Sequence, residues 1–195
     1  MLLWTTQPLS LLTDLERDGV YRCAREKSWN LTKQGSLEKP YAWLIAQMRE
    51  RIGEMPEGVT YPVWAWHTWE YARTCPDPES AAFLKRTEDK VLLTLDIPEE
   101  RVLLSDFEAW QSVMMGTYVA KGTTKEALEE ELKAMDEVEE GQMEAFIRAS
   151  WENVFLIDPV DRWDMHRGRY VQATFWEVRR EDVKETRVLR AAKEI

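Results

Sequence analysis

Tryptophan is unusually abundant in this chain, with ten residues among 195. Three of them, Trp64, Trp66 and Trp69, fall within one short segment that reads YPVWAWHTW from Tyr61 onward. Each buried indole contributes a large apolar surface together with an N–H group that needs a hydrogen-bond partner. The chain must therefore build either an unusually aromatic core or a pocket lined with aromatic rings.

The composition indicates a globular protein. Hydrophobic residues make up 44% of the chain and charged residues 32%, a balance typical of folded domains. A length of 195 residues fits one domain over 1–195, which would bury about 70% of its unfolded surface. No stretch approaches the ~20 consecutive apolar residues of a membrane span, so no membrane association is expected.

Two features favour a cytoplasmic location. The residues Met1–Thr5 lack the basic region and the long apolar region of a secretory signal. The two cysteines, Cys23 and Cys75, show no C-x-x-C spacing, which favours reduced thiols.

Negative charge is concentrated in one segment. The net charge is −10, and the segment 126–140 holds eight acidic residues and one lysine, so the rest of the chain carries only −3. Leu128, Leu132 and Met135 keep helical spacing within it, which predicts a long acidic helix with Gly141 as a break or kink. No basic face suited to phosphate binding is present, so duplex nucleic acid is not an expected partner.

The order of the remaining patterns predicts the fold class. Strand-like segments alternate irregularly with amphipathic ones, so we expect an α+β domain with a mixed or antiparallel central sheet of about five to six strands, flanked by helices. The expected strands are Leu2–Gln7, Val20–Cys23, Tyr61–Trp69, Val91–Ile97, Val102–Leu104 and Tyr170–Val178. The expected helices include one that starts at Pro8–Ser10 and stops at Gly19, together with Pro40–Ile52 and Phe107–Tyr118. Ser105 and Asp106 stand where the cap of the last of these helices belongs.

The tryptophan-rich strand is the first candidate site. Side chains alternate along a strand, so Trp64 and Trp66 share one face while His67 lies on the other. Two indoles on one face suit stacking on a planar ligand such as a nucleobase, at roughly 1–3 kcal/mol per stacked base. The alternative is that both faces are covered and the rings belong to the core. No metal is expected, because His67 and Cys75 lack further ligands at the spacing of a zinc site.

The last predicted strand holds the second candidate site. Gln172 and Trp176 share one face, and Glu177 has the parity of the opposite, apolar face. An interior carboxylate is costly unless it is paired, so Glu177 is either functional or bound by an arginine. Gln7 and Gln172 would form a polar, amide-lined spot if the first and last strands were neighbours.

Four phrases connect the chain to a known family. They are LWTTQP from Leu3, YPVWAW from Tyr61, VLLSDFEAW from Val102 and QATFWE from Gln172. In this order they resemble a bacterial family described as domain of unknown function 3841. The resemblance implies one cytoplasmic prokaryotic domain and no particular activity.

The layout also resembles that of ADP-ribosyltransferase-like domains, which begin with a short strand and a helix ending at glycine and close with a strand bearing a glutamate. This resemblance implies that Thr5 and Gln7 contact the nicotinamide side of NAD and that Glu177 is catalytic, although Gln172 stands nearer to where such enzymes place their acid.

Three hypotheses about function follow. The first is binding of a small planar ligand, nucleotide- or base-like, or of a protein partner through the tryptophan face, with no cofactor. The second is an enzyme that transfers ADP-ribose from NAD, and the third is a protein-interaction module that uses the acidic helix. The candidate binding residues are Thr5, Gln7, Trp64, Trp66, His67, Gln172 and Trp176, with Glu177 as the candidate catalytic residue.

Overall fold

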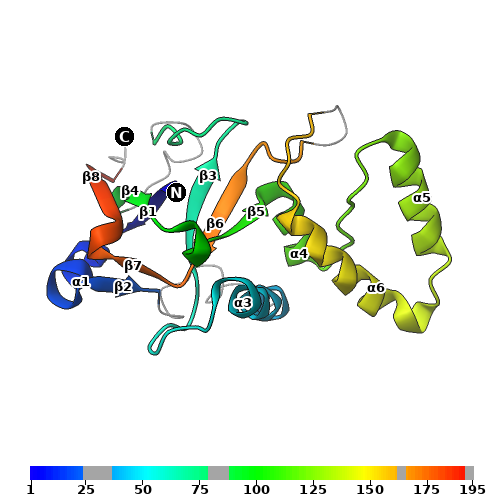
Figure 1. The fold of residues 1–195 in the computed structure, drawn as a ribbon, viewed down its shortest axis with the longest axis horizontal. Coiled ribbons are helices and arrows are strands. Elements are labelled where there is room, and N and C mark those ends of the chain that lie inside the picture. The colour runs from blue at the N-terminus through cyan, green and yellow to red at the C-terminus, as the bar shows by residue number, and fades with distance from the viewer. Residues whose placement is uncertain (24–36, 79–87, 162–165, 192–195) are drawn as a thin grey trace.

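The computed structural model of the protein describes residues 1–23, 37–78, 88–161 and 166–191 (Figure 1). Its centre is a six-stranded sheet in the order β5-β6-β3-β1-β4-β8, in which every neighbouring pair is antiparallel. The strands are β1 (Leu2–Pro8), β3 (Val63–Thr68), β4 (Lys90–Asp96), β5 (Leu103–Asp106), β6 (Val171–Phe175) and β8 (Val183–Leu189). The prediction of an α+β fold around such a sheet is confirmed.

The first helix packs beside the sheet because its sequence is amphipathic, and it ends at a glycine. Helix α1 (Ser10–Asp18) buries Leu11 and Leu15. It stops at Gly19, whose φ of +73° lies in the left-handed region that glycine adopts without steric cost. The chain then forms β2 (Val20–Arg22), which pairs with β7 (Glu177–Arg179) in a separate two-stranded sheet.

Two separate cores pack against the sheet. One core holds Val63 and Ala65 of β3 together with aliphatic side chains of β1, β4, β6 and α1. The other core receives α3 (Glu38–Ile52), α4 (Phe107–Met115) and the short helix η5 (Trp151–Phe155). It is aromatic, since Trp43, Trp110 and Trp151 are buried in it, so part of the tryptophan surplus serves as core.

The predicted strand 170–178 is interrupted, which corrects the expectation of a single strand. Residues 171–175 form β6 in the large sheet, and residues 177–179 form β7 in the small one. Trp176 lies between them with its ring buried, and its Nε1 donates to the carbonyl of Gly53 at 3.0 Å. This anchor lets the chain change sheets at Trp176.

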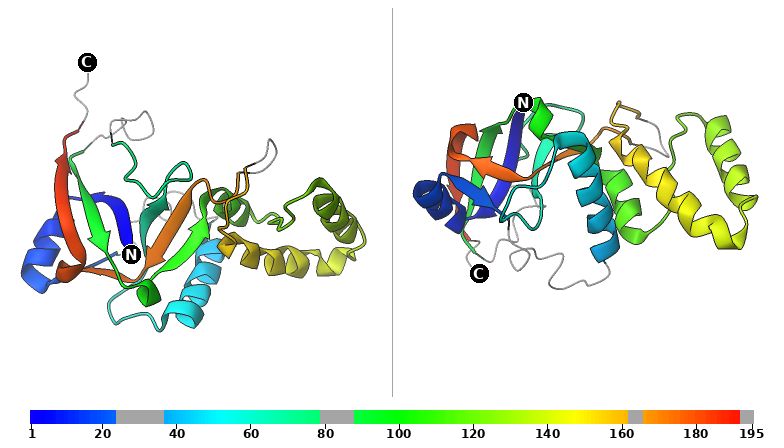
Figure 2. Two further views of the ribbon diagram at one scale, coloured as in Figure 1. Left: turned by 45° about the horizontal axis from the view of Figure 1, so that its top comes forward. Right: turned by 60° about the horizontal axis from the view of Figure 1, so that its bottom comes forward.

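The acidic segment forms two helices, where one long helix was expected. Helix α5 (Lys125–Asp136) and helix α6 (Met143–Ser150) are separated by the short turn η4 (Glu140–Gln142) that contains Gly141. Acidic residues at 136–140 disfavour continuation of α5, because the C-terminal end of a helix repels negative charge. The two helices form an arm that extends away from the sheet (Figure 2).

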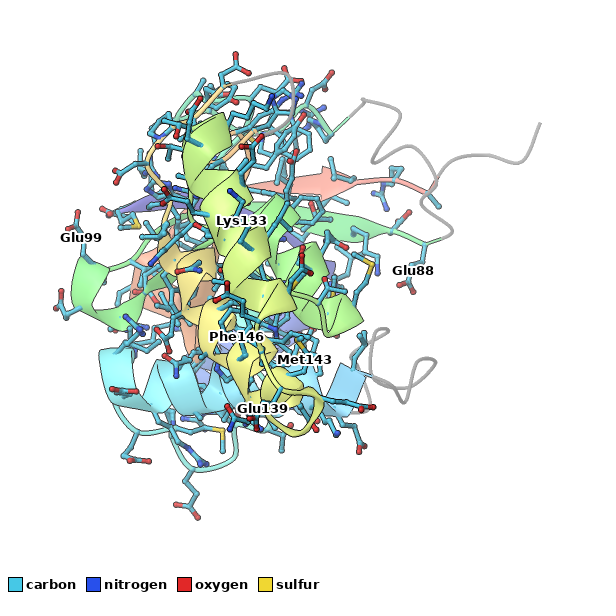
Figure 3. The ribbon with its side chains drawn as sticks, turned by 90° about the vertical axis from the view of Figure 1, so that its right-hand side faces the viewer. Glu88, Glu99, Lys133, Glu139, Met143 and Phe146 are labelled. Carbon is cyan, nitrogen blue, oxygen red and sulfur yellow. The ribbon has the colours of Figure 1, made fainter. Side chains whose placement is uncertain are left out.

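The arm is attached by few apolar contacts. Not one residue of α5 is buried, and Leu132 is 55% exposed. The ring of Tyr118 stacks on Phe146 of α6 at 5.5 Å, and its hydroxyl donates to Glu131 of α5 at 3.2 Å. Figure 3 looks onto the arm and shows Lys133, Glu139, Met143 and Phe146 along it.

Within the parts of the chain that the structure describes, none of the helices has the length and apolar character needed to cross a membrane.

Candidate functional site

A cleft of about 230 Å³ lies between β1 and β3, near the middle of the sheet. Its walls are residues 4–7 of β1, residues 64–66 of β3 and Gln172 of β6. Five of the residues predicted from the sequence meet here, namely Thr5, Gln7, Trp64, Trp66 and Gln172.

The cleft exists because the β1–β3 ladder opens. Strand β1 pairs with β4 along its whole length, from Leu2 to Pro8. With β3 it keeps a single registered pair, Trp4 opposite Trp66. Within the described residues no second registered pair continues this ladder, and the cleft lies beside residues 4–7 of β1 and 64–66 of β3.

Side chains replace some of the hydrogen bonds that the open ladder lacks. The hydroxyl of Thr5 donates to the carbonyl of Trp64 at 2.6 Å, and the Nε2 of Gln7 donates to the Thr5 oxygen at 2.8 Å. Thr5 is 2% exposed, so its hydroxyl is shielded from water, whereas Gln7 is half-buried. The Thr5 bond thus links β1 to β3 at the cleft.

Gln7 and Gln172 line the same cleft for a reason that the sequence did not reveal. The two strands that carry them are not neighbours, because β3 lies between β1 and β6. Trp66 is the residue opposite both Trp4 on one side and Gln172 on the other. The cleft therefore spans three strands, and the expected contact between the first and last strands is wrong.

Two buried polar atoms on the cleft residues have no hydrogen-bond partner. These are the Nε1 of Trp64, a donor, and the Oε1 of Gln172, an acceptor; within the described residues the one other such side-chain atom is the Oγ of Ser105. Ser105 is the residue opposite Gln172 in the β5–β6 pair. An unsatisfied buried polar atom costs about 1–3 kcal/mol, so these groups need an explanation.

Neighbouring aromatic rings fix the two indoles of the cleft. Trp64 lies 5.3 Å from Trp110 of α4, between ring centroids. Trp66 lies 4.8 Å from Trp69 and 5.4 Å from Phe107, in edge-to-face geometry. Both indoles are half-buried, so each has one side in aromatic packing while its residue also lines the cleft.

The cleft is electrically neutral. Among the residues that the structure describes, its walls contain no aspartate, glutamate, lysine, arginine or histidine. Hydrogen bonding and ring contacts are thus the interactions that these walls offer to a ligand.

Two predicted binding residues do not line the cleft. The register shift between Trp66 and Thr68 interrupts the alternation of β3 at His67, and the Nδ1 of His67 lies 2.9 Å from the Thr68 hydroxyl. Trp176 belongs to the aromatic core, and its N–H is already bonded to Gly53. Trp176 therefore does not stand beside Gln172 in the cleft, although the sequence pattern placed the two on one face.

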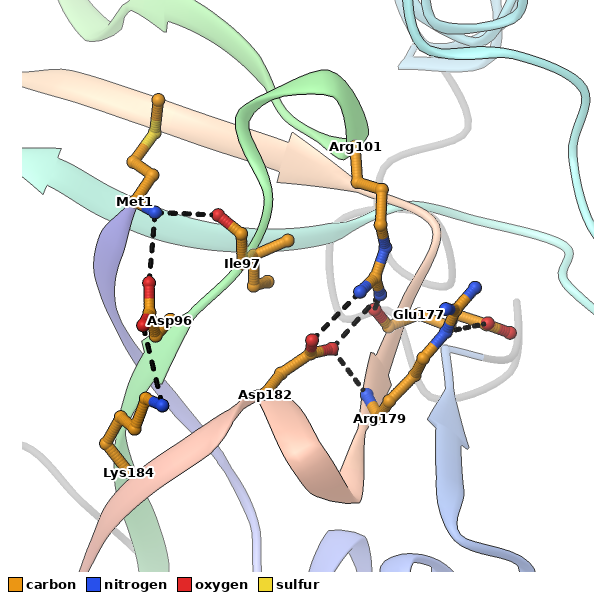
Figure 4. Close-up of polar contacts among 8 residues, drawn as sticks. All are labelled: Met1, Asp96, Ile97, Arg101, Glu177, Arg179, Asp182 and Lys184. Atoms are coloured by element: carbon orange, nitrogen blue, oxygen red, sulfur yellow. Dashed lines mark hydrogen bonds and ion pairs between the residues drawn. The ribbon is translucent and has the colours of Figure 1, made fainter.

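Glu177 also lies outside the cleft, in the small sheet. It is 7% exposed, and its two carboxylate oxygens accept from the Nε of Arg22 and the Nε of Arg179, both at 3.0 Å. The neighbouring Asp182 accepts two hydrogen bonds from Arg101, at 2.8 and 3.0 Å (Figure 4). Pairing with two arginines therefore explains how the carboxylate of Glu177 can lie in the interior.

Sequence reasoning missed Trp4 and Thr6, which line the cleft beside the predicted Thr5 and Gln7. Strand alternation alone would place Trp4 and Thr6 on the face opposite Thr5. All four residues line the cleft, because it lies between the strands and side chains from both faces of β1 border it. The one signal available was Trp4, an indole at the centre of the first predicted strand.

A second and larger groove lies at the base of the arm. It measures about 580 Å³ and is bordered by α3, α4 and α6, with Met114, Met115 and Met143 among its lining residues. It contains none of the predicted site residues. A protein contact through the acidic helix, most of whose residues are exposed, stays a prediction.

Comparison with known protein families identifies the family of this chain. A family model described as Domain of unknown function (DUF3841) matches residues 2–184. The chain belongs to the DUF3841 family. No curated protein and no solved structure matches it. The DUF3841 match covers β1, β3 and β6, so the cleft lies within the family region.

Proposed function

We propose that this DUF3841 protein binds a small planar ligand in the cleft between β1 and β3. The observation that carries the proposal is the opening of the β1–β3 ladder beside Trp4–Trp66, which surrounds about 230 Å³ with aromatic and amide side chains. Ligand sites commonly combine apolar walls with a small number of placed polar groups. This cleft has that composition.

The aromatic packing around the cleft supports a planar ligand. Trp64 and Trp66 are each held by rings of other elements, so they lose little conformational freedom when a ligand arrives. Stacking on an aromatic side chain contributes roughly 1–3 kcal/mol per base. The amides of Gln7 and Gln172 would orient the ligand within its plane.

Blocking the cleft tests the proposal. Thr6 lines the cleft and is half-buried, so Thr6→Phe should fill part of it. Titration with free bases, nucleosides and nucleotides, followed by tryptophan fluorescence and calorimetry, is expected to show binding by the wild type and at least a tenfold loss in this variant.

The matched control is Thr186→Phe on the exposed edge strand β8, which should bind as the wild type does. Absence of binding by every probe, or equal binding by the Thr6→Phe variant, would refute the proposal.

Transfer of ADP-ribose from NAD is the second candidate. It is favoured by Thr5 and Gln7, which both line the cleft. The residue proposed to be catalytic, Glu177, is instead held by two arginines in the small sheet, and Gln172 in the cleft has no negative charge to stabilise a cationic sugar.

We therefore expect ligand binding without turnover. If the enzyme hypothesis holds, wild type will consume NAD and Glu177→Gln will not, although its ligand binding is retained.

A cytoplasmic location remains part of the proposal. It is supported by Cys23 and Cys75, which are not joined in a disulfide, since reduced cysteines are typical of that compartment.

A further inference from the structure

Two apolar surfaces at the arm stay exposed in the single chain. One is the groove at the base of the arm, about 580 Å³ in volume, where Met115 is 70% exposed. The other is on helix α5, where Leu132 is 55% exposed. Among the large hydrophobic side chains that the structure describes, these two are the most exposed. Exposed apolar side chains that gather in one region commonly mark an interaction site.

We propose that the protein forms a two-fold symmetric dimer in which α5 of each copy lies in the groove of the other. Each chain carries one groove and one such helix, so two copies that exchange arms cover all four surfaces. A reciprocal contact of this kind closes on itself, whereas a one-way contact would continue into a filament or a ring. In the single chain α5 does not fill the groove, since none of the described residues that line it belongs to α5.

Helix α5 has an apolar side that suits a groove. Leu128, Leu132 and Met135 follow an i, i+4, i+7 spacing, so they lie along one side of the helix. Leu128 and Met135 are half-buried in the single chain, and no residue of α5 is fully buried. A helix of 12 residues is marginal on its own in water, because most helical stability in proteins comes from packing of the apolar face. A second copy over Leu132 would supply that packing.

The groove offers adaptable apolar walls to such a helix. Met114 and Met115 come from the end of α4, and Met143 and Ile147 come from α6 (Figure 3 labels Met143). Methionine side chains are flexible and polarisable, so they fit the irregular apolar surface of a partner. Docking of an amphipathic helix in an apolar groove is a common mode of recognition, and its anchors have the spacing that the apolar residues of α5 show.

Charge favours the acidic helix as the occupant of this groove. Lys39 and Glu144 on its lining form an exposed ion pair at 3.6 Å, so Arg148 leaves the lining with a net positive charge. Glu129 and Asp136 border the apolar side of α5, because each directly follows one of its apolar residues. Docking would bring these carboxylates toward the cations of the groove, where opposite charges orient the partners and speed association. A basic helix would meet the same cations unfavourably.

The oligomeric state in solution tests the proposal. Sedimentation velocity and light scattering of the full chain are expected to show a dimer at micromolar concentration. Leu132→Glu, in the helix, and Met115→Glu, in the groove, should each weaken dimerisation at least about a hundredfold. Loss of one buried apolar side chain weakens a contact at least about tenfold, and each substitution occurs at both contacts of the symmetric dimer. Val188→Glu on β8, at a residue 42% exposed, is the matched control and should leave the dimer intact.

A mixture of the two variants tests the exchange itself. In the mixed dimer the unchanged helix of the Met115→Glu chain lies in the unchanged groove of the Leu132→Glu chain, so one of the two contacts is restored. The mixture should therefore dimerise more tightly than either variant alone. Both replaced side chains are exposed in the single chain, so each variant is expected to fold, and circular dichroism verifies this.

Three outcomes overturn the proposal. The first is a wild type that stays monomeric at every concentration, and binding of octanoate by that monomer would assign the groove to a small amphiphile in place of a second copy. The second is a dimer that survives either substitution, because the interface would then lie elsewhere. The third is a mixture that associates no better than its components, because the helix and the groove would then not face each other. Ligand binding in the cleft between β1 and β3 is independent of all three.

Discussion

Replacing Gln172 by methionine is expected to stabilise the unliganded protein. The Oε1 of Gln172 is buried and has no hydrogen-bond partner, although the residue as a whole is half-buried. Methionine has nearly the same length, leaves no polar atom unsatisfied and fits strand β6 without a change of backbone. The substitution therefore removes a cost and introduces no cavity.

The magnitude follows from the cost of an unsatisfied acceptor. Such an atom costs about 1–3 kcal/mol when it is fully buried. Because Gln172 is only half-buried, we expect the lower part of this range, an increase of about 1–2 kcal/mol in the free energy of unfolding. In a chain of this size, 1 kcal/mol raises the melting temperature by about 2–4 °C.

Thermal and urea unfolding of the unliganded protein measure the effect. The control is Gln142→Met, an exposed glutamine in η4, which should stay within about 0.5 kcal/mol of the wild type. A Gln172→Met variant that is less stable than the wild type would refute the reasoning, because it would mean that the amide oxygen is satisfied in solution. A more stable variant that no longer binds ligand would show stability exchanged for function.

Three further substitutions test the structure around the site. Thr5→Val should lower the free energy of unfolding by about 1–3 kcal/mol in urea denaturation, because the Trp64 carbonyl loses its donor, whereas the exposed Thr186→Val should have little effect. Asp182→Ala should cost about 3–5 kcal/mol in the same assay, because it leaves Arg101 without its buried carboxylate; a loss under 1 kcal/mol would contradict this. Burial raises the pKa of the Asp106 carboxyl, so the folded protein holds that proton more tightly than the unfolded chain and this residue's contribution to stability falls as the pH rises from about 4. Asp106→Asn keeps one acceptor for the cap but cannot also accept from the Gly168 N–H, which Asp106 Oδ2 does at 2.7 Å. We therefore expect the variant to be less stable than the wild type at about pH 4 and the deficit to shrink as the pH rises. A deficit that does not change with pH would argue against the raised pKa.

Hydrophobic periodicity and capping residues were sufficient to predict most of the helices and strands. The alternating segment 91–97 is β4, the amphipathic segment before Gly19 is α1, and Asp106 caps α4 by accepting from the Ala109 N–H at 2.8 Å. These features depend on residues close together in the chain, so the sequence displays them directly. The interruption of the acidic helix was predicted at Gly141, whereas α5 already ends at Asp136.

The candidate site was predictable in its residues and not in its geometry. Thr5, Gln7, Trp64, Trp66 and Gln172 were selected as an aromatic and polar group, and the structure brings them to one cleft. The presence of β3 between β1 and β6, and the separation of β1 from β3 after a single pair, depend on contacts between distant segments. No local pattern encodes such contacts.

Trp176 and Glu177 show that residue type alone does not identify the residues that line the cleft. Both have the composition of site residues, yet Trp176 donates to Gly53 in the core and Glu177 is neutralised by Arg22 and Arg179.

The sequence by itself determined the α+β class, the family and the chemistry available on each strand, because these follow from residue type and short-range spacing. Only the tertiary structure decided which tryptophans became core and which ones border an open space. That choice depends on how the layers pack against each other and where one ladder stays open, which is a property of the whole chain.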